Sequence, residues 1–257
     1  MKLAGPERPA YFLYQLLWGT VDWLFPPICG GCERLGFRWC EACQGQVSKV
    51  TGPLCPCCGQ PQSREEICKE CQDAPPDYQA LRSYGVFEGK LRAALHRLKY
   101  KRDIAMGEAL SKHLIELYNH FKWDIDLVVP VPLGSQRARD RGYNQAGLLG
   151  RPLAYAVQKP YQPDALQRIR ETRSQVGLSA KERRGNVAGV FRAKREQVAG
   201  KVVLVVDDVT TTGSTISACA QALREAGATA VYGLTLARAV LNTHTDDQPK
   251  PSTIKWR

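Results

Sequence analysis

The residues best suited to chemistry form one short segment in the C-terminal half of the chain. Asp207 and Asp208 directly follow the apolar run Val202–Val206, and the hydroxyl-rich sequence TTTGST occupies residues 210–215. Carboxylates accept hydrogen bonds from a pair of vicinal ribose hydroxyls, whereas hydroxyls and backbone N–H groups at a helix N-terminus bind phosphate. A diol site beside a phosphate site is the pattern expected for a ribose 5-phosphate.

The simpler interpretation of this segment is a group of capping side chains between a strand and a helix. A cap needs one Ser or Thr, so it leaves the two acids and most of the hydroxyls unexplained. Other phosphate-binding loops fit less well, because the chain has no G-x-x-x-x-G-K-[ST] sequence and no G-x-G-x-x-G after a strand. We therefore interpret residues 207–215 as a ribose-phosphate socket.

The elements that position this segment follow from apolar periodicity. Residues 201–208 are apolar almost throughout, which predicts a strand buried on both faces. Apolar residues spaced at i, i+3, i+4 and i+7 predict helices, and shorter apolar runs predict further strands. The predicted strands are 83–87, 126–132, 186–193, 201–208 and 230–238, and the predicted helices centre on 91–98, 110–121, 144–157 and 216–223. Gly147, Gly150 and Pro152 weaken the third helix. Alternation of the two types predicts an α/β fold with a mainly parallel sheet flanked by helices.

A second chemical signal lies near the N-terminus, where nine of the ten cysteines fall between residues 29 and 71. Four CxxC pairs, each able to direct two sulfurs at one point, predict two tetrahedral Zn²⁺ sites. The predicted ligands are Cys29, Cys32, Cys40, Cys43, Cys55, Cys58, Cys68 and Cys71. Consecutive pairing would give a double zinc ribbon and is preferred, while interleaved pairing (29/32 with 55/58) would give a cross-braced module. Four thiolates leave no open position, so both metals are expected to be structural. Cys57 is expected not to be a ligand, and Cys219 is expected in a helix core.

Composition and charge restrict the partners and the location. The 257 residues carry a formal net charge of +11, which suits phosphate-bearing partners without distinguishing nucleotide from nucleic acid. No apolar run approaches the length of a membrane span, and no export signal is recognisable, so the cytoplasm is expected. The expected divisions are a short N-terminal helix at 1–25, the zinc module at 26–73, the main domain at 80–240 and a disordered tail at 241–257.

The segment KLRAALHRLKYKR, residues 90–102, carries six basic residues opposite an apolar face. A solvated helix face and a DNA-binding or phosphate-binding face are equally good interpretations of it. His96 on this helix is expected to lie at the surface. The chain lacks an interleaved row of aromatic residues that would indicate a stacking platform for bases.

The run of apolar residues, two acids and TTGST resembles the 5-phosphoribosyl-1-pyrophosphate (PRPP) signature of type I phosphoribosyltransferases. Three further segments, at 95–103, 130–146 and 168–191, follow the cysteine module in the sequence. Together they resemble the ComF family of competence proteins, which includes ComFC and the GntX-like proteins. The resemblance covers roughly residues 20 to 240 and implies a type I phosphoribosyltransferase fold.

The resemblance also implies roles for individual residues. Asp207 and Asp208 would hold the ribose hydroxyls, and the 5-phosphate would bind to Thr211, Thr212, Gly213, Ser214 and Thr215. The pyrophosphate side would comprise Val131, Pro132, Leu133, Arg137, Arg139, Arg141 and Asn144. A flexible loop would carry Arg168, Arg170, Gln175, Arg183, Arg184 and Asn186. Mg²⁺ would accompany PRPP, bridging its diphosphate and ribose hydroxyls.

Three functions are compatible with these features. The resemblance implies a role in natural transformation, in which the protein handles single-stranded DNA beside a helicase-like ATPase. The alternatives are an active PRPP-dependent phosphoribosyltransferase of nucleotide metabolism and a regulator that senses PRPP or a nucleotide. No residue run identifies an acceptor pocket, so binding is better supported than turnover.

Overall fold

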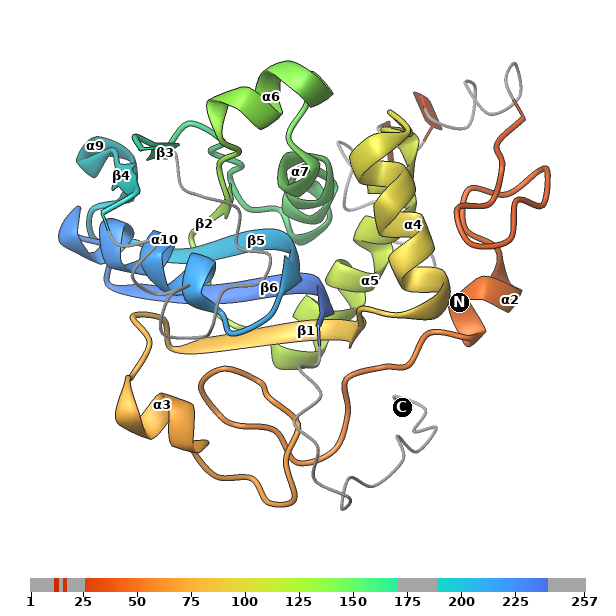
Figure 1. Cartoon of the computed structure of the whole chain (residues 1–257). Coiled ribbons are helices and arrows are strands. Elements are labelled where there is room, and N and C mark those ends of the chain that lie inside the picture. The colour runs from red at the N-terminus through yellow and green to blue at the C-terminus, as the bar shows by residue number, and fades with distance from the viewer. Residues whose placement is uncertain (1–11, 14–15, 18–25, 171–188, 240–257) are drawn as a thin grey trace.

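A four-stranded parallel sheet forms the centre of the computed structural model, which describes residues 12–13, 16–17, 26–170 and 189–239 (Figure 1). The strand order is β1-β6-β5-β2, and every neighbouring pair is parallel. The strands are β1 (Ala80–Val86), β2 (Leu127–Pro130), β5 (Val202–Thr210) and β6 (Ala230–Arg238). The mainly parallel α/β architecture predicted from periodicity is confirmed.

Helices cover both faces of this sheet, and β5 shows why its sequence is apolar throughout. Val203 and Val205 pack into one core with Ile216 of α10 (Ser214–Glu225), whereas Leu204 and Val206 pack into the other. The second core also contains residues of α4 (Gly89–Tyr100), α5 (Ala105–Phe121) and α7 (Gln145–Val157). A strand with helices on both faces needs apolar side chains in both directions.

The helix α7 is complete despite its glycines and proline. A Cβ on Gly147 would come within 2.9 Å of the Tyr161 hydroxyl, and Gly150 faces Val128 of β2 and Val206 of β5. Gly147 leaves room for the Tyr161 hydroxyl, whereas a Cβ on Gly150 would make ordinary contact with the sheet, so tertiary packing outweighs the low helix propensity of these residues. The contact between Gly147 and Tyr161 forms only in the folded protein, so local periodicity does not reveal why this position is glycine.

Some elements differ from the prediction. Strand β1 begins at residue 80, earlier than the predicted residue 83. Residues 186–188 of the predicted strand at 186–193 lie outside the described residues, and its described part contains β4 (Phe191–Ala193), which pairs antiparallel with β3 (Leu166–Arg168) outside the main sheet. The helices α6 (Ser135–Arg141) and α9 (Arg195–Val198) were not predicted. These elements are too short to produce a detectable apolar period.

The cysteine module contains α2 (Glu41–Gly45) and α3 (Lys69–Asp73) and covers the outer edge of β1 (Figure 1). Leu81 N–H donates to the Cys57 carbonyl at 2.7 Å, and Val86 N–H donates to the Ser48 carbonyl at 2.8 Å. Val50 N–H in turn donates to the Tyr84 carbonyl at 3.0 Å. The module therefore pairs backbone groups that an edge strand would otherwise expose.

Within the described residues, the longest apolar stretches in helices fall short of what a membrane crossing requires. The predicted tail at 241–257 and most of the predicted N-terminal helix at 1–25 lie outside the described residues.

Candidate ribose-phosphate site and zinc centres

The acid pair, Asp207 and Asp208, lies near the carboxyl end of β5, the edge at which α/β proteins bind ligands. Asp208 is buried and Asp207 is half-buried. Asp208 N–H donates to Asp207 Oδ1 at 2.8 Å, which holds the first carboxylate against the backbone of the second. Burial, together with the charge of Asp208, raises the pKa of Asp207 to about 8.

The phosphate loop, residues 210–215, connects β5 to the N-terminus of α10. Gly213 adopts φ 81° and ψ 2°, a left-handed conformation that glycine reaches without strain. The Thr212 and Ser214 hydroxyl oxygens lie 2.5 Å apart, and Ser214 N–H points to Thr212 Oγ1 at 3.4 Å. The loop thus brings hydroxyls and the positive end of a 12-residue helix together, which suits a phosphate.

Lys99 is the residue of this site that sequence reasoning missed. Its Nζ lies 2.7 Å from Asp208 Oδ2, with 19% of the lysine side chain and 5% of the aspartate side chain exposed. Lys99 follows Leu98 on α4 and therefore stands beside the apolar stripe of that helix. Its position next to that stripe was the available signal, but only the fold shows that α4 reaches the acid pair.

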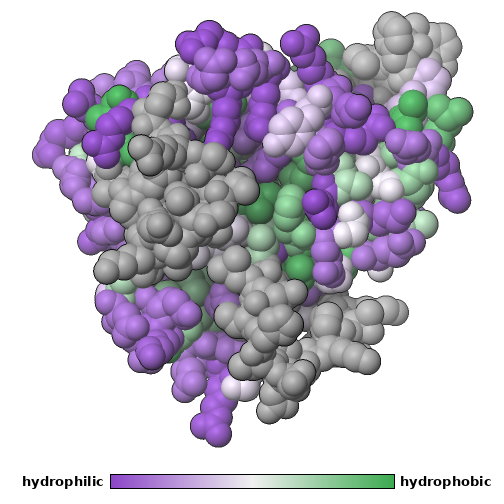
Figure 2. All heavy atoms as spheres, viewed as in Figure 1, coloured by the Kyte–Doolittle hydropathy of each residue, from purple (hydrophilic) through white to green (hydrophobic). Residues whose placement is uncertain are grey.

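Lys99 also lines a pocket of about 370 Å³ between the end of α4 and α6. The other lining residues, which add three cations, one carboxylate and two phenol rings, are Tyr100, Arg102, Arg137, Asp140, Arg141 and Tyr143. We call this the basic pocket. Hydrophilic side chains gather along the upper edge of the molecule, over α6, in Figure 2. The cationic side chains suit an anion, and the rings provide aromatic walls.

Two of the three predicted arginines of the pyrophosphate side, Arg137 and Arg141, line this pocket. Arg141 donates to Gln145 Oε1 at 2.9 Å, and its guanidinium lies 5.1 Å from the centre of the Tyr100 ring. These contacts orient the guanidinium fork. Arg139 is exposed and donates to the Gln136 side chain at 2.8 Å instead.

Asn144 has a structural role. Its Oδ1 accepts from Ala146 N–H at 3.0 Å as the N-cap of α7, and its Nδ2 donates to the Val131 carbonyl at 2.9 Å. Val131 is also held by a backbone hydrogen bond to β5, in which its N–H donates to the Val206 carbonyl at 2.9 Å. Asn144 therefore fixes the start of the segment that carries Val131, Pro132 and Leu133, and α6 follows that segment.

The predicted flexible loop is described only at its start. Arg168 ends β3, with its guanidinium 5.7 Å from the Phe191 ring centre, and Arg170 follows two residues later. Gln175, Arg183, Arg184 and Asn186 lie outside the described residues.

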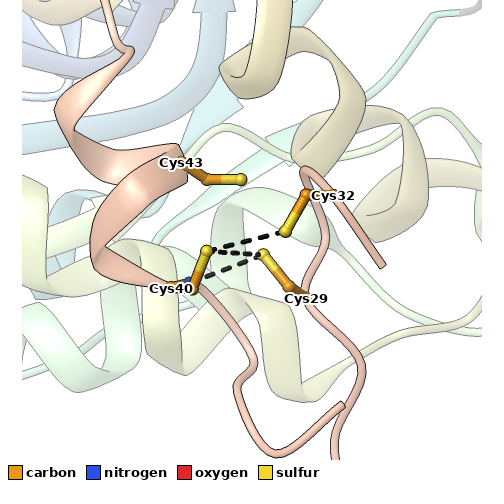
Figure 3. A group of neighbouring side chains, drawn as sticks. All are labelled: Cys29, Cys32, Cys40 and Cys43. Carbon is orange, nitrogen blue, oxygen red and sulfur yellow. Dashed lines mark hydrogen bonds between the residues drawn. The ribbon is translucent and has the colours of Figure 1, made fainter. Parts of the chain in front are cut away.

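The eight predicted zinc ligands form two clusters. Cys29, Cys32, Cys40 and Cys43 form the first (Figure 3), and Cys55, Cys58, Cys68 and Cys71 form the second. This is the consecutive pairing, so the interleaved alternative is wrong. Cys57 belongs to neither cluster, and Cys219 is fully buried in the core, both as predicted.

The geometry of both clusters fits Zn²⁺. The sulfurs of Cys29 and Cys40, and likewise of Cys58 and Cys68, lie 3.6 Å apart. Tetrahedral Zn–S bonds of about 2.3 Å place sulfurs about 3.8 Å apart. Backbone N–H groups of Gly31 and Cys40 point to Cys29 Sγ at 3.5 Å, as expected around a thiolate.

Comparison with known proteins finds two domain matches. Residues 20–72 match the double zinc ribbon domain, and residues 99–255 match the phosphoribosyl transferase domain. The DNA utilization protein YhgH of Escherichia coli K12 is 34% identical over 226 residues, covering 84% of this chain and 98% of that protein. The competence protein ComFC of Bacillus subtilis is 29% identical over 208 residues, covering 78% of this chain and 84% of that protein.

Among solved structures, glutamine PRPP amidotransferase from B. subtilis, complexed with ADP and GMP, aligns with 55% of this chain and 30% of its own. The identity is 25% and the TM-score is 0.40. Two domain matches, similar relatives and two four-cysteine clusters together indicate the family of this chain. The chain, which joins a double zinc ribbon to a phosphoribosyltransferase-type domain, belongs to the ComF family.

Proposed function

We propose that this protein binds PRPP or a closely related ribose phosphate in a continuous site formed by the phosphate loop, the acid pair and the basic pocket. The observation that carries the proposal is the position of Lys99, which contacts Asp208 and also lines the basic pocket. A ribose on the acid pair would therefore have its C1 substituent directed toward Lys99, Arg137 and Arg141. Guanidinium groups match the oxygens of a diphosphate in pairs.

Magnesium fits this arrangement as a companion of the ligand. The carboxylate oxygens of Asp207 and Asp208 are donors that a hard cation prefers, and both would face the ribose hydroxyls. When bound, Mg²⁺ would neutralise diphosphate charge. The protein's own contribution is to orient the ribose through the acid pair and the phosphate through the loop.

We further propose that ligand binding serves DNA uptake, since relatives carry the names DNA utilization protein and competence protein. Single-stranded DNA shares phosphate groups with the proposed ligand, and its bases, which PRPP lacks, can lie against Tyr100. Tyr100 is 61% exposed and lies between Arg141 and His96, whose ring centre is 4.7 Å away. A helicase-like ATPase is the partner proposed for this role.

Calorimetric titration with Mg²⁺ and PRPP tests the ribose site. The double substitution Asp207→Ala and Asp208→Ala should abolish detectable binding. The matched control is Asp124→Ala with Asp164→Ala, which removes two carboxyl groups from exposed positions away from the site. Equal affinity in the two double variants would refute the proposal. Pyrophosphate release with PRPP and candidate bases, run in parallel, would identify an active transferase.

Single-strand binding is tested by fluorescence anisotropy with labelled oligo(dT) over a series of salt concentrations. Affinity should fall steeply with salt because phosphate contacts release counterions. Removing Arg137 and Arg141 should flatten the logarithmic salt slope by about 1 to 2. Arg224→Ala, on α10 across the sheet, is the control. A flat salt response in the wild type would refute DNA binding through the basic surface.

A further inference from the structure

The second zinc ribbon and the phosphate loop are joined by one buried side chain, Arg238, at the end of β6. This side chain is 1% exposed. Its Nη1 donates to the Thr211 carbonyl of the phosphate loop at 3.0 Å, and its Nη2 donates to the Cys58 carbonyl in the second zinc knuckle. One guanidinium therefore contacts the metal module and the proposed phosphate site at the same time.

The surroundings of Arg238 fix its position. Its carbonyl accepts from Phe87 N–H at 2.7 Å, and Ala239 N–H donates to the Thr210 carbonyl at 2.8 Å. Arg238 thus lies opposite Thr210 in the sheet register, at the residue where the phosphate loop begins. Tyr78 packs closely against the loop, because a Cβ on Gly213 would lie 2.5 Å from its hydroxyl oxygen.

A buried guanidinium requires a counter-charge. In the described part of the chain, no carboxylate lies within ion-pair distance of Arg238, and its Nε has no hydrogen-bond partner. Four thiolates around Zn²⁺ leave a net charge of about −2 on the second zinc centre. The second zinc centre therefore supplies the negative charge next to the Arg238 guanidinium. Cys58, whose carbonyl accepts from Arg238, also provides one sulfur of that centre.

We propose that Arg238 is a positioning residue through which the second zinc centre holds the phosphate loop in its binding conformation, an inference that rests on the proposed ribose-phosphate site. The loaded centre supplies the charge that keeps the guanidinium in place, and the guanidinium fixes the Thr211 carbonyl. Loss of the second zinc leaves a buried cation without a counter-charge and releases the loop. The first zinc centre has no such connection within the described residues.

Arg238→Met tests the link because it keeps the apolar stem and removes the donors. Arg82→Met is the matched control, since Arg82 donates to the Pro56 and Cys57 carbonyls beside the same knuckle and does not contact the loop. Arg238→Met should speed amide hydrogen exchange across residues 211–215 at least tenfold and weaken ribose 5-phosphate binding about 10-fold to 100-fold. Arg82→Met should change neither by more than about twofold.

The metal is tested by Cys71→Ser and Cys32→Ser, which each remove one ligand from the second and the first centre respectively. Zinc analysis should find one metal per chain in both, while only Cys71→Ser should speed exchange in residues 211–215. Arg238→Lys keeps the charge but has a single donor nitrogen in place of two, so it should give intermediate exchange, and it serves if Arg238→Met does not fold.

Loop exchange that is the same in Arg238→Met and Arg82→Met, or in Cys71→Ser and Cys32→Ser, would overturn the inference. Exchange requires no ligand, so the result is independent of the proposed function. A wild-type protein that fails to bind ribose 5-phosphate and PRPP refutes the proposed site, and the exchange comparison still decides whether Arg238 links zinc to the loop.

Discussion

Replacing Lys99 with Met tests whether this lysine stabilises the acid pair, because the substitution removes one cation and keeps the length of the side chain. The Nζ–Oδ2 distance to Asp208 is 2.7 Å. At an effective dielectric constant of about 20, two unit charges at this separation attract by about 6 kcal/mol. Desolvation cancels part of that attraction, but a buried carboxylate that loses its partner keeps its desolvation cost.

We expect Lys99→Met to lower the free energy of unfolding by about 3 kcal/mol at pH 7.5. PRPP affinity should fall about tenfold or more, since the same ammonium lines the basic pocket.

Urea unfolding at pH 7.5 in the presence of zinc, followed by circular dichroism, measures the effect. Lys101→Met is the control, because Lys101 carries the same charge, follows the same helix and is exposed. If both variants unfold at the same urea concentration at pH 7.5, Lys99 does not stabilise the acid pair. If both also bind PRPP with wild-type affinity, Lys99 is not part of the ligand site.

Two further predictions concern the metal and the acid pair. Purified protein should contain about two zinc ions per chain, and chelation should unfold the N-terminal module; a metal-free protein that keeps its fold would refute structural zinc. Because the pKa of Asp207 is raised to about 8, this carboxyl is protonated in the free protein at pH 6.5 and mostly ionised at pH 9. Binding of Mg²⁺ with PRPP should therefore strengthen over this range and release a proton, seen in calorimetry as a dependence on buffer ionisation enthalpy. Asp207→Asn should remove that dependence, and an unchanged proton release would show that another group titrates.

Several features of this protein were determined by local sequence. The CxxC spacing brings two sulfurs together within one turn, so the zinc ligands were recognisable without any knowledge of the fold. A buried strand that ends in acids and a hydroxyl-rich turn is likewise a continuous segment. For that reason the strand, the turn that follows it and the helix α10 could all be predicted, together with the parallel sheet that β5 implies.

Tertiary structure decided which other residues those segments contact. The sequence left the pairing of the two cysteine units open, because spacing alone permits either partition, and the fold brings each unit together by itself. For the basic segment 90–102, the sequence did not distinguish a solvated helix face from a binding face. The surroundings of its side chains depend on where α4 lies in the fold. Lys99 belongs to the acid pair only because α4 packs beside the end of β5.

The same reason applies to Asn144 and Arg238. Asn144 is expected on the pyrophosphate side, and only the fold shows that its polar atoms also cap α7 and hold Val131. Arg238 was an ordinary strand residue in sequence, and parallel pairing placed it between the phosphate loop and the second zinc ribbon. Contacts between residues far apart in the chain depend on the register and layering of the whole sheet, which no local pattern encodes.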